Sequence, residues 1–448
     1  MAQTESSAAI RIKTLLQQFG LGRAHVAACM SGDWGELVIE HADCIHSLTV
    51  VAPHLDKGIP DGLNTFQSPA MIIAGDQGAP AQRASDLAAR FENSERFELS
   101  DYFSPMWADT IADRTADIAE ALCEFLARAD SEHALPTVTL PQGAGEIAGI
   151  KYRVRGAGPP LVLLPLSMAP SQWEPLVSRI SDRYCTITLG GAHLGAISLL
   201  EARGRSGYGD LVAQVVDQAK LTSGETILEV GCGSGVLVRA LAKRTERRNP
   251  IIATDINTYL LSEARTLAAK DGLEETITFE EANAEILPYP DAQFDVAISC
   301  TVLEEGQADR MLSELARVTR SEGRVVVMTR AIDVHWWVNL PVPDELRSKL
   351  NELGQSTGAG VADDGCADAS LYRRLLRVGL SPLMMGPQFA IYKEGERLNS
   401  VLARRLALLP ESEARNCRDT ARQAKADGTV FVAEPFHCAV GVMSDRAI

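Results

Sequence analysis

The sequence lacks long apolar segments and paired cysteines. No run approaches the ~20 consecutive apolar residues that cross a bilayer. The opening residues, MAQTESSAAIRIKT, contain no apolar stretch of a secretory signal. The nine cysteines are odd in number and scattered without a CxxC pair, which is typical of reduced cytoplasmic thiols. We therefore expect a cytoplasmic protein without a membrane segment, and no metal site is predicted.

Basic residues are also in short supply. Lys and Arg number 43 against 59 Asp and Glu, which gives a net charge of −16. Nucleic acids and anionic membranes bind through a basic face, so neither is expected as a partner. The content of 46% hydrophobic and 23% charged residues is ordinary for a folded protein and excludes global disorder, collagen and coiled coil.

The length of 448 residues predicts two to three domains at roughly 100–200 residues each. Residues 130–147 are rich in Pro, Gly and polar residues and are predicted to be a linker. A glycine-rich passage over 189–210 precedes a new pattern, and 351–368 is predicted to be a mobile loop.

The C-terminal half alternates apolar strands with helices. Such alternation predicts βαβ units and a doubly wound parallel sheet, with ligands at the carboxyl ends of the strands. The predicted strands are 225–230, 251–256, ITFEEA, FDVAIS, GRVVVMTRA and PFHCAVGV, and the predicted helices are 236–244, about 257–270 and ADRMLSELARVTR.

A glycine-rich turn, ILEVGCGSGVL, follows the first of these strands. Gly231, Gly233 and Gly235 lie between strand and helix, where glycine allows a tight turn and close approach of a ligand. The dinucleotide pattern GxGxxG is not satisfied, because a Val stands at its last position. Glu229 precedes the glycines, and Asp255 ends the second strand, 24 residues after Gly231. A carboxylate there can accept both ribose hydroxyls of a nucleoside.

This turn resembles motif I of the class I methyltransferases that use S-adenosylmethionine (SAM). The segments NAEILPYPDAQFDVAIS (283–299) and ARVTRSEGRVVVM (316–328) are similar to later motifs of quinone-type small-molecule methyltransferases. The resemblance implies a Rossmann-like methyltransferase domain over about 205–448, with SAM as cofactor and a small-molecule acceptor. One departure is Glu305, where many relatives carry a His.

The resemblance also implies which residues meet SAM. Asn283 and Ala284 would face the adenine, whereas Cys300 and Thr301 would lie near the methionine moiety or the methyl group. The full expected set is Glu229, Gly231, Cys232, Gly233, Gly235, Asp255, Ile256, Asn283, Ala284, Cys300 and Thr301.

Methyl transfer from a sulfonium is an in-line displacement, so the enzyme chiefly places the nucleophile and excludes water. A base is needed only where the acceptor must lose a proton. Candidate catalytic groups near the strand ends are Cys300, Glu304 and His335, with Tyr372 as a further one. His335 is also compatible with an ordinary packed or surface histidine beside the tryptophan pair 336–337, of which we expect one in the acceptor pocket and one in the core.

Cys300, Cys366 and Cys438 raise an alternative. Thiolates bind soft metalloids, and the segment around Cys366 is weakly similar to the Cys-containing segment of arsenite methyltransferases. The protein would then be an arsenite or thiol methyltransferase that uses these three residues. Otherwise all three pack as small buried hydrophobes.

The N-terminal part resembles a different family in an unusual order. Residues 149–191 are similar to the beginning of the α/β-hydrolase fold. Segments similar to its later parts, from the nucleophile turn to the final helix, are 24–53, 68–80 and 103–128. We therefore expect one permuted α/β-hydrolase-like module, whose C-terminal part is 1–135 and whose N-terminal part is 142–195; truncated pieces of tandem domains are the alternative.

The hydrolase machinery is damaged at every position. The mechanism needs a G-x-S-x-G elbow, an acid, a His and an oxyanion hole. The elbow reads CMSGD around Ser31, and Gly78, two residues after Asp76, stands where the acid is expected. Tyr102 and Phe103 stand where the His is expected, and Pro165-Leu166 stand at the oxyanion hole. The module is therefore expected to act as a scaffold, a lid or an oligomer surface rather than as a hydrolase.

Together these features predict a SAM-dependent methyltransferase acting on a small molecule, which is compatible with a homodimer. Two further alternatives stay open. One is a SAM-sensing binding protein without turnover, and the other is a hydrolase fused to a SAM domain, with Ser31 as nucleophile.

Overall fold

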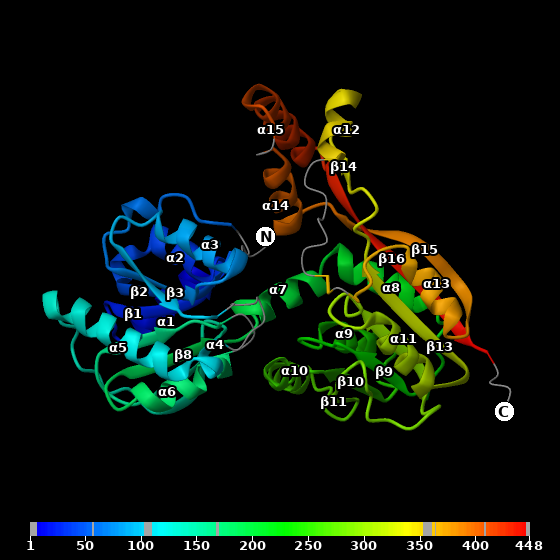
Figure 1. Cartoon of the computed structure of the whole chain (residues 1–448), viewed down its shortest axis with the longest axis horizontal. Helices are drawn as coiled ribbons and strands as arrows, with labels where there is room; N and C mark the ends of the chain where they lie inside the picture. The colour runs from blue at the N-terminus through cyan, green and yellow to red at the C-terminus, as the bar shows by residue number, and fades with distance from the viewer. Residues whose placement is uncertain are drawn as a thin grey trace. The chain divides into compact units, whose positions relative to one another are not determined.

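The chain folds into two compact units, Met1–Leu199 and Leu200–Ile448. Each is an α/β structure built on an eight-stranded, mostly parallel sheet (Figure 1). Among the described residues, no helix is long and apolar enough to cross a membrane. The computed structural model describes residues 7–55, 58–102, 110–166, 170–352, 361–362, 364–406 and 409–444.

The first unit combines two separate chain segments in one sheet, of order β4-β3-β2-β1-β7-β8-β6-β5. Only β6 is antiparallel to its neighbours. Because β1 pairs with β7, the segments before residue 135 and after 142 share this sheet. The strands are β1 Ala24–Met30, β2 Ile45–His54, β3 Ala70–Gly75, β4 Ser94–Leu99, β5 Gly143–Ile147, β6 Ile150–Arg155, β7 Pro160–Leu163 and β8 Cys185–Gly190. The helices are α1 Ala8–Gln18, α2 Ser31–Glu40, α3 Gly78–Ala88, α4 Thr110–Asp113, α5 Thr115–Glu132, α6 Glu174–Ile180 and the first half of α7 Gly195–Gly204.

The central strands of this unit are buried on both sides. β1, β3 and β8 have no exposed position, as expected for parallel strands covered by helices on both faces of a sheet. Trp34 of α2 belongs to the core cluster on one face, and Trp173 before α6 belongs to the other cluster. Both indole side chains are fully buried.

The second unit has the sheet order β11-β10-β9-β12-β13-β16-β14, with β15 paired to β16. Strands β9 to β13 are parallel, and β16 is antiparallel to β13, β14 and β15, so the sheet is mixed. The strands are β9 Ile227–Val230, β10 Ile251–Asp255, β11 Ile277–Glu281, β12 Phe294–Cys300, β13 Thr319–Arg330, β14 Trp337–Asn339, β15 Leu380–Tyr392 and β16 Phe431–Met443. The helices are α8 Gly207–Asp217, α9 Val236–Arg244, α10 Thr258–Lys270, α11 Ala308–Val318, α12 Asp344–Glu352, α13 Ser370–Arg377, α14 Gly395–Leu406 and α15 Glu411–Ala426.

Two stretches differ from the prediction. The glycine-rich passage 189–210 is largely helical, because it contains all of α7 and the start of α8. One side of α8 buries apolar residues, and this stripe outweighs the ~1 kcal/mol that each glycine costs in a helix. The predicted linker 130–147 begins inside α5 and ends with β5. Half of the predicted loop 351–368 lies outside the described residues.

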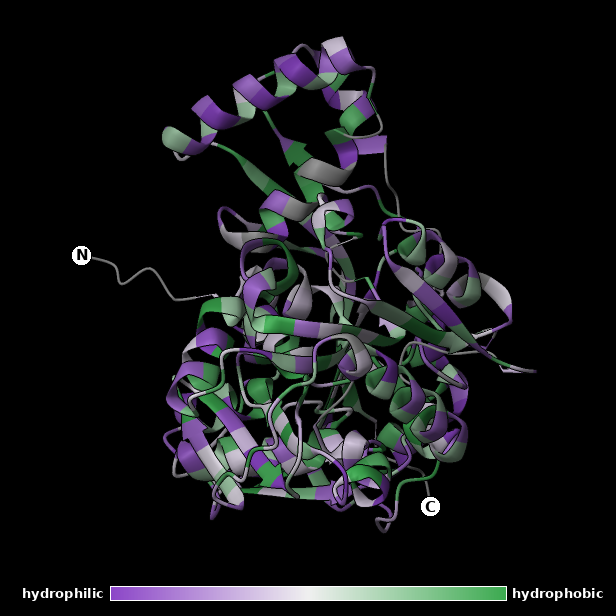
Figure 2. Ribbon diagram, turned by 90° about the vertical axis from the view of Figure 1, so that its left-hand side faces the viewer, coloured by the Kyte–Doolittle hydropathy of each residue, from purple (hydrophilic) through white to green (hydrophobic). Residues whose placement is uncertain are grey.

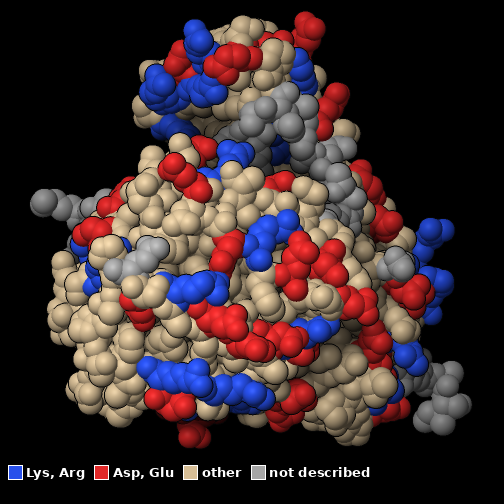
Figure 3. Space-filling model, turned by 60° about the vertical axis from the view of Figure 1, so that its left-hand side comes forward, with Lys and Arg blue, Asp and Glu red and all other residues tan. Residues whose placement is uncertain are grey.

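Polar and apolar residues are segregated on the helices. In Figure 2 the helices at the top of the view carry hydrophilic residues (purple) with hydrophobic ones (green) at intervals. In α15, Ala414, Cys417, Ala421 and Ala424 are buried while most other positions are polar. Figure 3 shows acidic and basic side chains intermixed on the face drawn, in keeping with the modest acidic excess of the chain.

Candidate functional site

The glycine turn between β9 and α9 has a backbone that needs glycine. Gly231, Gly233 and Gly235 have φ values of 78°, 54° and 72°, in the left-handed region that costs other residues roughly 1–2 kcal/mol. A Cβ on Gly231 would lie 2.1 Å from the side chain of Val302. The amides of Gly231 and Cys232 both donate to the Thr254 carbonyl at 2.8 Å. The turn is therefore held against the end of β10 as an open cradle of backbone groups.

Asp255 stands at the carboxyl end of β10, directly beside this turn. Its carboxylate accepts hydrogen bonds from the backbone amides of Gly233, at 2.8 Å, and Asn257, at 2.9 Å. These bonds fix the position of the carboxylate between the turn and α10. Burial nevertheless raises the pKa of Asp255 above its usual value, because a desolvated carboxylate is less stable when ionised.

Glu229 is the most perturbed acid of the site. It is 2% exposed, and its Oε2 has no hydrogen-bond partner among the described residues. Burial, and then the charge of Asp255, raise the pKa of Glu229 to about 8. An orphaned buried carboxylate oxygen is rare in folded proteins, and a cation bound beside it would favour the ionised form.

Two further acids follow β12. Burial raises the pKa of Glu304 and of Glu305, and Asp255 contributes to the shift at Glu305. Glu304 is 3% exposed; it accepts from the backbone amide of Arg330 and forms an ion pair with the Arg330 side chain at 3.3 Å. The ends of β9, β10 and β12 thus form an acidic site, which is suited to a cationic ligand.

Thr301, immediately after β12, has an unusual backbone and two polar neighbours. Its φ is 57°, a strained value that is concentrated at functional sites. Its hydroxyl lies 3.3 Å from Arg203 Nη1 and 3.3 Å from Tyr208 Oη. The Arg203 guanidinium lies 3.8 Å from the centre of the Tyr208 ring. Arg203 and Tyr208 were not predicted as site residues, because they lie in the glycine-rich passage 189–210, which carries no recognisable motif.

An apolar edge adjoins these acids. Ile256, after β10, is 66% exposed and Ile286, after β11, is 67% exposed. Between them in sequence, Asn283 accepts a hydrogen bond from the Glu285 amide at 2.8 Å, and Ala284 is half-buried. Exposed aliphatic side chains beside a polar turn suit a flat ring with polar edges. Ile286 was not among the residues expected from the sequence.

The predicted catalytic residues lie in different environments. Cys300 and Glu304 are buried, whereas His335 is exposed. Trp336 is half-buried, with the guanidinium groups of Arg397 and Arg405 both 5.1 Å from its ring centre. The structure thus gives Cys300, Glu304 and His335 no shared arrangement resembling a catalytic dyad.

A hydrogen-bonded chain of Tyr372, His437 and Asp333 lies in the same unit. Tyr372 Oη is 2.7 Å from His437 Nδ1, and His437 Nε2 is 2.6 Å from Asp333 Oδ1. His437 is 2% exposed. Burial alone would raise the pKa of Asp333, but hydrogen bonds from His437 and from the Ala369 amide hold this pKa below its usual value. Burial raises the pKa of Tyr372. The Tyr372 hydroxyl and the Asp333 carboxylate thus face the two ring nitrogens of His437.

The three cysteines of the alternative hypothesis are not gathered into one cluster. Cys300 and Cys438 belong to one hydrophobic core cluster and Cys366 to another. Burial raises the pKa of Cys438 to about 12, and it raises those of Cys300 and Cys366 as well. All three are free thiols, and thiols rather than thiolates are favoured at neutral pH.

The first unit has a serine at the strand–helix junction but an unstrained one. Ser31 begins α2 directly after β1 and is 3% exposed, and its φ is not positive. Asp76 accepts the backbone amides of Asp101 and Tyr102, and the Tyr102 hydroxyl donates to Asp113. Phe103 lies outside the described residues.

The glycine turn lies in a segment that is similar to a known protein family. Residues 227–323 match the family model described as a methyltransferase domain. The second unit carries a methyltransferase domain. It is of the class I, SAM-dependent kind, and the matched segment contains the glycine turn, Asp255 and Thr301.

Two curated relatives share this segment. The ubiquinone/menaquinone biosynthesis C-methyltransferase UbiE of Hahella chejuensis is 28% identical over 148 residues, which cover 31% of this chain and 59% of that protein. The UbiE protein of Methylococcus capsulatus is 32% identical over 114 residues, which cover 25% of this chain and 46% of that protein. The chain thus spans about half the length of the curated relatives it matches. Among solved structures, the [4+2]-cyclase SpnF is 19% identical with a TM-score of 0.37, over 54% of this chain and 85% of that chain.

Proposed function

We propose that the protein is a methyltransferase that transfers the methyl group of SAM to a small-molecule acceptor. The observation that carries this proposal is the unpartnered Oε2 of Glu229 beside the glycine turn and Asp255. SAM carries a sulfonium and an ammonium group, which suit the acidic side chains of Glu229 and Asp255. The residues present therefore fit this cofactor.

Individual roles follow from the positions of the side chains. Asp255 would accept the ribose hydroxyls, and the turn from Gly231 to Gly235, with Cys232, would hold the amino-acid part. Ile256, Asn283 and Ala284, together with Ile286, would line the adenine. Cys300 ends β12 and Thr301 follows it, and both would lie near the methyl group. The Arg203 guanidinium, which donates to the Thr301 hydroxyl, is suited to binding a carboxylate.

SAM supplies an electrophilic methyl group when bound, and the protein's part is to position the acceptor and remove its proton. We assign the second task to Tyr372 and His437. Tyr372 would take a proton from the acceptor as its own proton passes to His437 Nδ1. Asp333 would then stabilise the imidazolium that forms. Tyr372 and His437, rather than Cys300, Glu304 or His335, are proposed to move the proton.

The acceptor is proposed to be a phenol or quinol whose carbon or oxygen attacks the methyl group. Two observations support this. The matched relatives are named as quinone-biosynthesis C-methyltransferases, and a proton relay is useful only where the acceptor loses a proton. The alternative of arsenite bound by Cys300, Cys366 and Cys438 is less favoured, because these thiols are buried and divided between two clusters.

A panel of acceptors tests the proposed function. S-adenosylhomocysteine release would be measured with the full chain and SAM under reducing conditions, with quinols, phenols, simple thiols, and arsenite plus thiol. Turnover with a quinol or phenol is expected. Turnover with arsenite alone would restore the three cysteines as ligands, and tight SAM binding without any turnover would favour a sensor.

Replacing Asp255 with Ala should weaken SAM binding by about 10–100-fold, since a hydrogen bond to a charged group contributes about 1.5–3 kcal/mol. Calorimetric titration of SAM measures this loss. Asp217→Ala is the control, because Asp217 is exposed and pairs only with Arg244 at the surface. Unchanged affinity in Asp255→Ala would remove this residue from the ribose role.

Glu229 should make SAM binding depend on pH. With a pKa of about 8 in the free protein, Glu229 is largely protonated at pH 7. A cationic ligand favours the carboxylate, so binding releases a proton and affinity rises from pH 6.5 to about pH 8.5. Asp255, Cys232 and Cys300 interact electrostatically with Glu229, and all three are the same in the wild-type chain and in Glu229→Gln. Calorimetry in buffers of different ionisation enthalpy measures the released proton, and Glu229→Gln should abolish the release. An equal slope in that variant would assign the proton to another group.

The first unit is proposed to be a permuted, catalytically silent α/β-hydrolase-like module. Read from β5, the strands run β5, β6, β8, β7 and then β1 to β4, with β6 antiparallel, and this is the strand arrangement typical of α/β-hydrolases. The unstrained backbone at Ser31 supports the loss of hydrolysis, because a nucleophile elbow needs a sharp, strained turn.

A further inference from the structure

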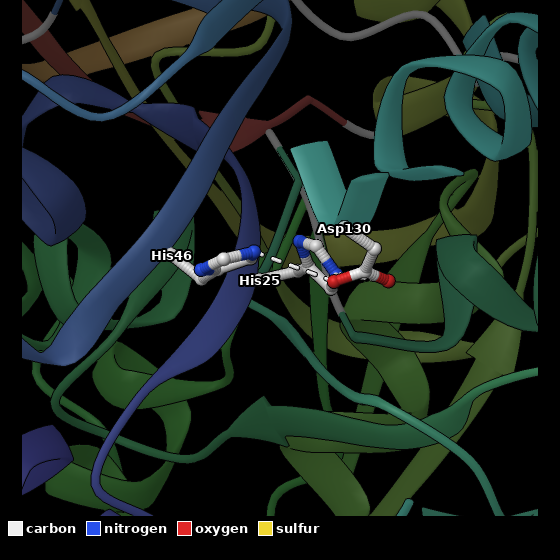
Figure 4. Close-up of side chains that lie close together, drawn as sticks. All are labelled: His25, His46 and Asp130. Carbon is white, nitrogen blue, oxygen red and sulfur yellow. Dashed lines mark hydrogen bonds and ion pairs between the residues drawn. The ribbon is translucent and has the colours of Figure 1, made fainter. Parts of the chain in front are cut away.

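The first unit contains a cluster of two histidines and one aspartate that no step above uses. His25 is the second residue of β1, His46 is the second residue of β2, and Asp130 lies near the end of α5. Figure 4 shows both imidazole rings and the carboxylate directed toward one another. Within the described part of the chain, this is the only group of three or more His, Cys, Asp or Glu residues whose ligand atoms all lie within 4.8 Å of one another.

The separations match those between ligands of a tetrahedral metal ion. His25 Nε2 and His46 Nε2 each lie 3.3 Å from Asp130 Oδ1. For metal–ligand bonds of about 2.0–2.1 Å, the edges of a tetrahedron are about 3.3–3.4 Å. His46 Nε2 is buried and, despite this short distance, has no hydrogen-bond partner. A ring nitrogen that lies close to a carboxylate oxygen but is not aligned for a hydrogen bond is expected where a metal ion would lie between the two atoms.

The outer contacts orient both rings toward this centre. His25 Nδ1 lies 2.8 Å from Ser47 Oγ. His46 forms a hydrogen bond with the backbone of Ala129, which leaves its Nε2 free of hydrogen bonds. Such partners on the second ring nitrogen fix the tautomer and the direction of metal-binding histidines.

An irregularity in the sheet brings the two histidines to one place. Ala24 pairs with Ile45 and His25 pairs with Ser47, so His46 is the extra residue of a β-bulge. Bulges redirect a side chain that regular pleating would send elsewhere. Ser31 lies at the opposite end of β1, six residues or roughly 20 Å from His25. The cluster is therefore separate from the hydrolase-like nucleophile position.

We infer that His25, His46 and Asp130 bind one divalent transition-metal ion of the zinc class, with water completing the coordination. The side chain of Asp130 is 18% exposed, which leaves a path for this water. The ion would tie the end of α5 to β1 and β2. No sequence motif indicates this site, because its ligands are 21 and 84 residues apart.

Metal titration of the full chain tests this inference. The protein would be stripped with a chelator, and Co²⁺ binding would be followed by visible absorption, with Zn²⁺ content by elemental analysis. We expect one ion per chain and a cobalt spectrum without thiolate charge-transfer bands. Zn²⁺ should also raise the unfolding temperature by mass action.

Conservative variants separate coordination from hydrogen bonding. His46→Gln and Asp130→Asn keep shape and polarity, and each should lower affinity by more than the about 10–100-fold typical of an outer-shell loss. Ser47→Ala should lower it by about 10–100-fold while leaving the ligands in place. His335→Ala, an exposed histidine of the second unit, is the matched control and should bind normally.

Several results would overturn the inference. These are no Co²⁺ or Zn²⁺ binding by the folded wild-type chain, thiolate bands in its cobalt spectrum, and equal affinity in folded His46→Gln or Asp130→Asn. If those two variants do not fold, Ser47→Ala decides, and unchanged affinity there would contradict the site. In each of these cases the cluster is a His–Asp hydrogen-bond network, in which His25 Nε2 lies 3.4 Å from Asp130 Oδ2.

Discussion

Replacing His437 with Gln is expected to lower the turnover number by about 10²–10⁴-fold, the usual contribution of a positioned proton acceptor. The Gln side chain can still accept a hydrogen bond from Tyr372 but cannot take its proton at neutral pH. SAM affinity should be unchanged, because His437 lies on β16 while the proposed SAM residues lie at or after the carboxyl ends of β9, β10, β11 and β12. Steady-state kinetics with the acceptor found in the panel, and SAM titration of the same sample, measure the two effects.

Tyr372→Phe should reproduce the loss of turnover, because it breaks the chain at its outer end. Tyr289→Phe is the matched control: Tyr289 is another half-buried tyrosine of the same unit, and its hydroxyl donates to Glu280 at 2.6 Å. Unchanged turnover in Tyr372→Phe, or turnover that falls equally in Tyr289→Phe, would contradict the relay.

Gly231→Ala is expected to destabilise the second unit and to weaken SAM binding by at least about tenfold. The left-handed φ of 78° costs alanine roughly 1–2 kcal/mol. The new methyl group would also meet Val302 at 2.1 Å, and overpacking of this kind costs about 1–3 kcal/mol. Because the strand beside the turn cannot move freely, part of this strain should displace the turn that contacts the cofactor.

Gly224→Ala isolates the effect of the clash. Gly224 also has a positive φ, of 89°, but a Cβ there would meet nothing within 4 Å. The Gly224→Ala chain should lose only roughly 1–2 kcal/mol of its free energy of unfolding, the cost of a left-handed backbone for alanine, and should keep its SAM affinity. Chemical denaturation and calorimetry provide both measurements. Equal effects of the two substitutions would show that the contact between Gly231 and Val302 does not matter.

The local elements of the second unit could be predicted because their signals are short-range. The helix expected over 236–244 has those bounds, and the strand expected over 251–256 ends one residue earlier. Both follow from apolar runs and a glycine turn that lie within 30 residues of one another. The helices of 189–210 could not be predicted, because their stability comes from packing of α8 against the unit's core, which outweighs glycine's local preference.

The parts of the site that depend on tertiary contacts were not predicted. Asp333, Tyr372 and His437 meet only because β16 enters the sheet antiparallel to β13 and pairs His437 with Thr329. The sequence did indicate Tyr372 as a candidate, but it gave no indication of its partners. Likewise, Arg203 reaches Thr301 across 98 residues of sequence. In contrast, Asp255 is bonded to the glycine turn that follows the neighbouring strand, so its spacing in the sequence was sufficient.

Calorimetric titration of SAM into the full chain is the most direct test of the proposed SAM site at the glycine turn and Asp255. We expect saturable binding of one SAM per chain, tighter at pH 8.5 than at pH 6.5, and weakened by about 10–100-fold in Asp255→Ala. S-adenosylhomocysteine should compete for the same site. A folded chain that binds neither molecule, or that binds SAM equally well in Asp255→Ala and Gly231→Ala, would contradict it.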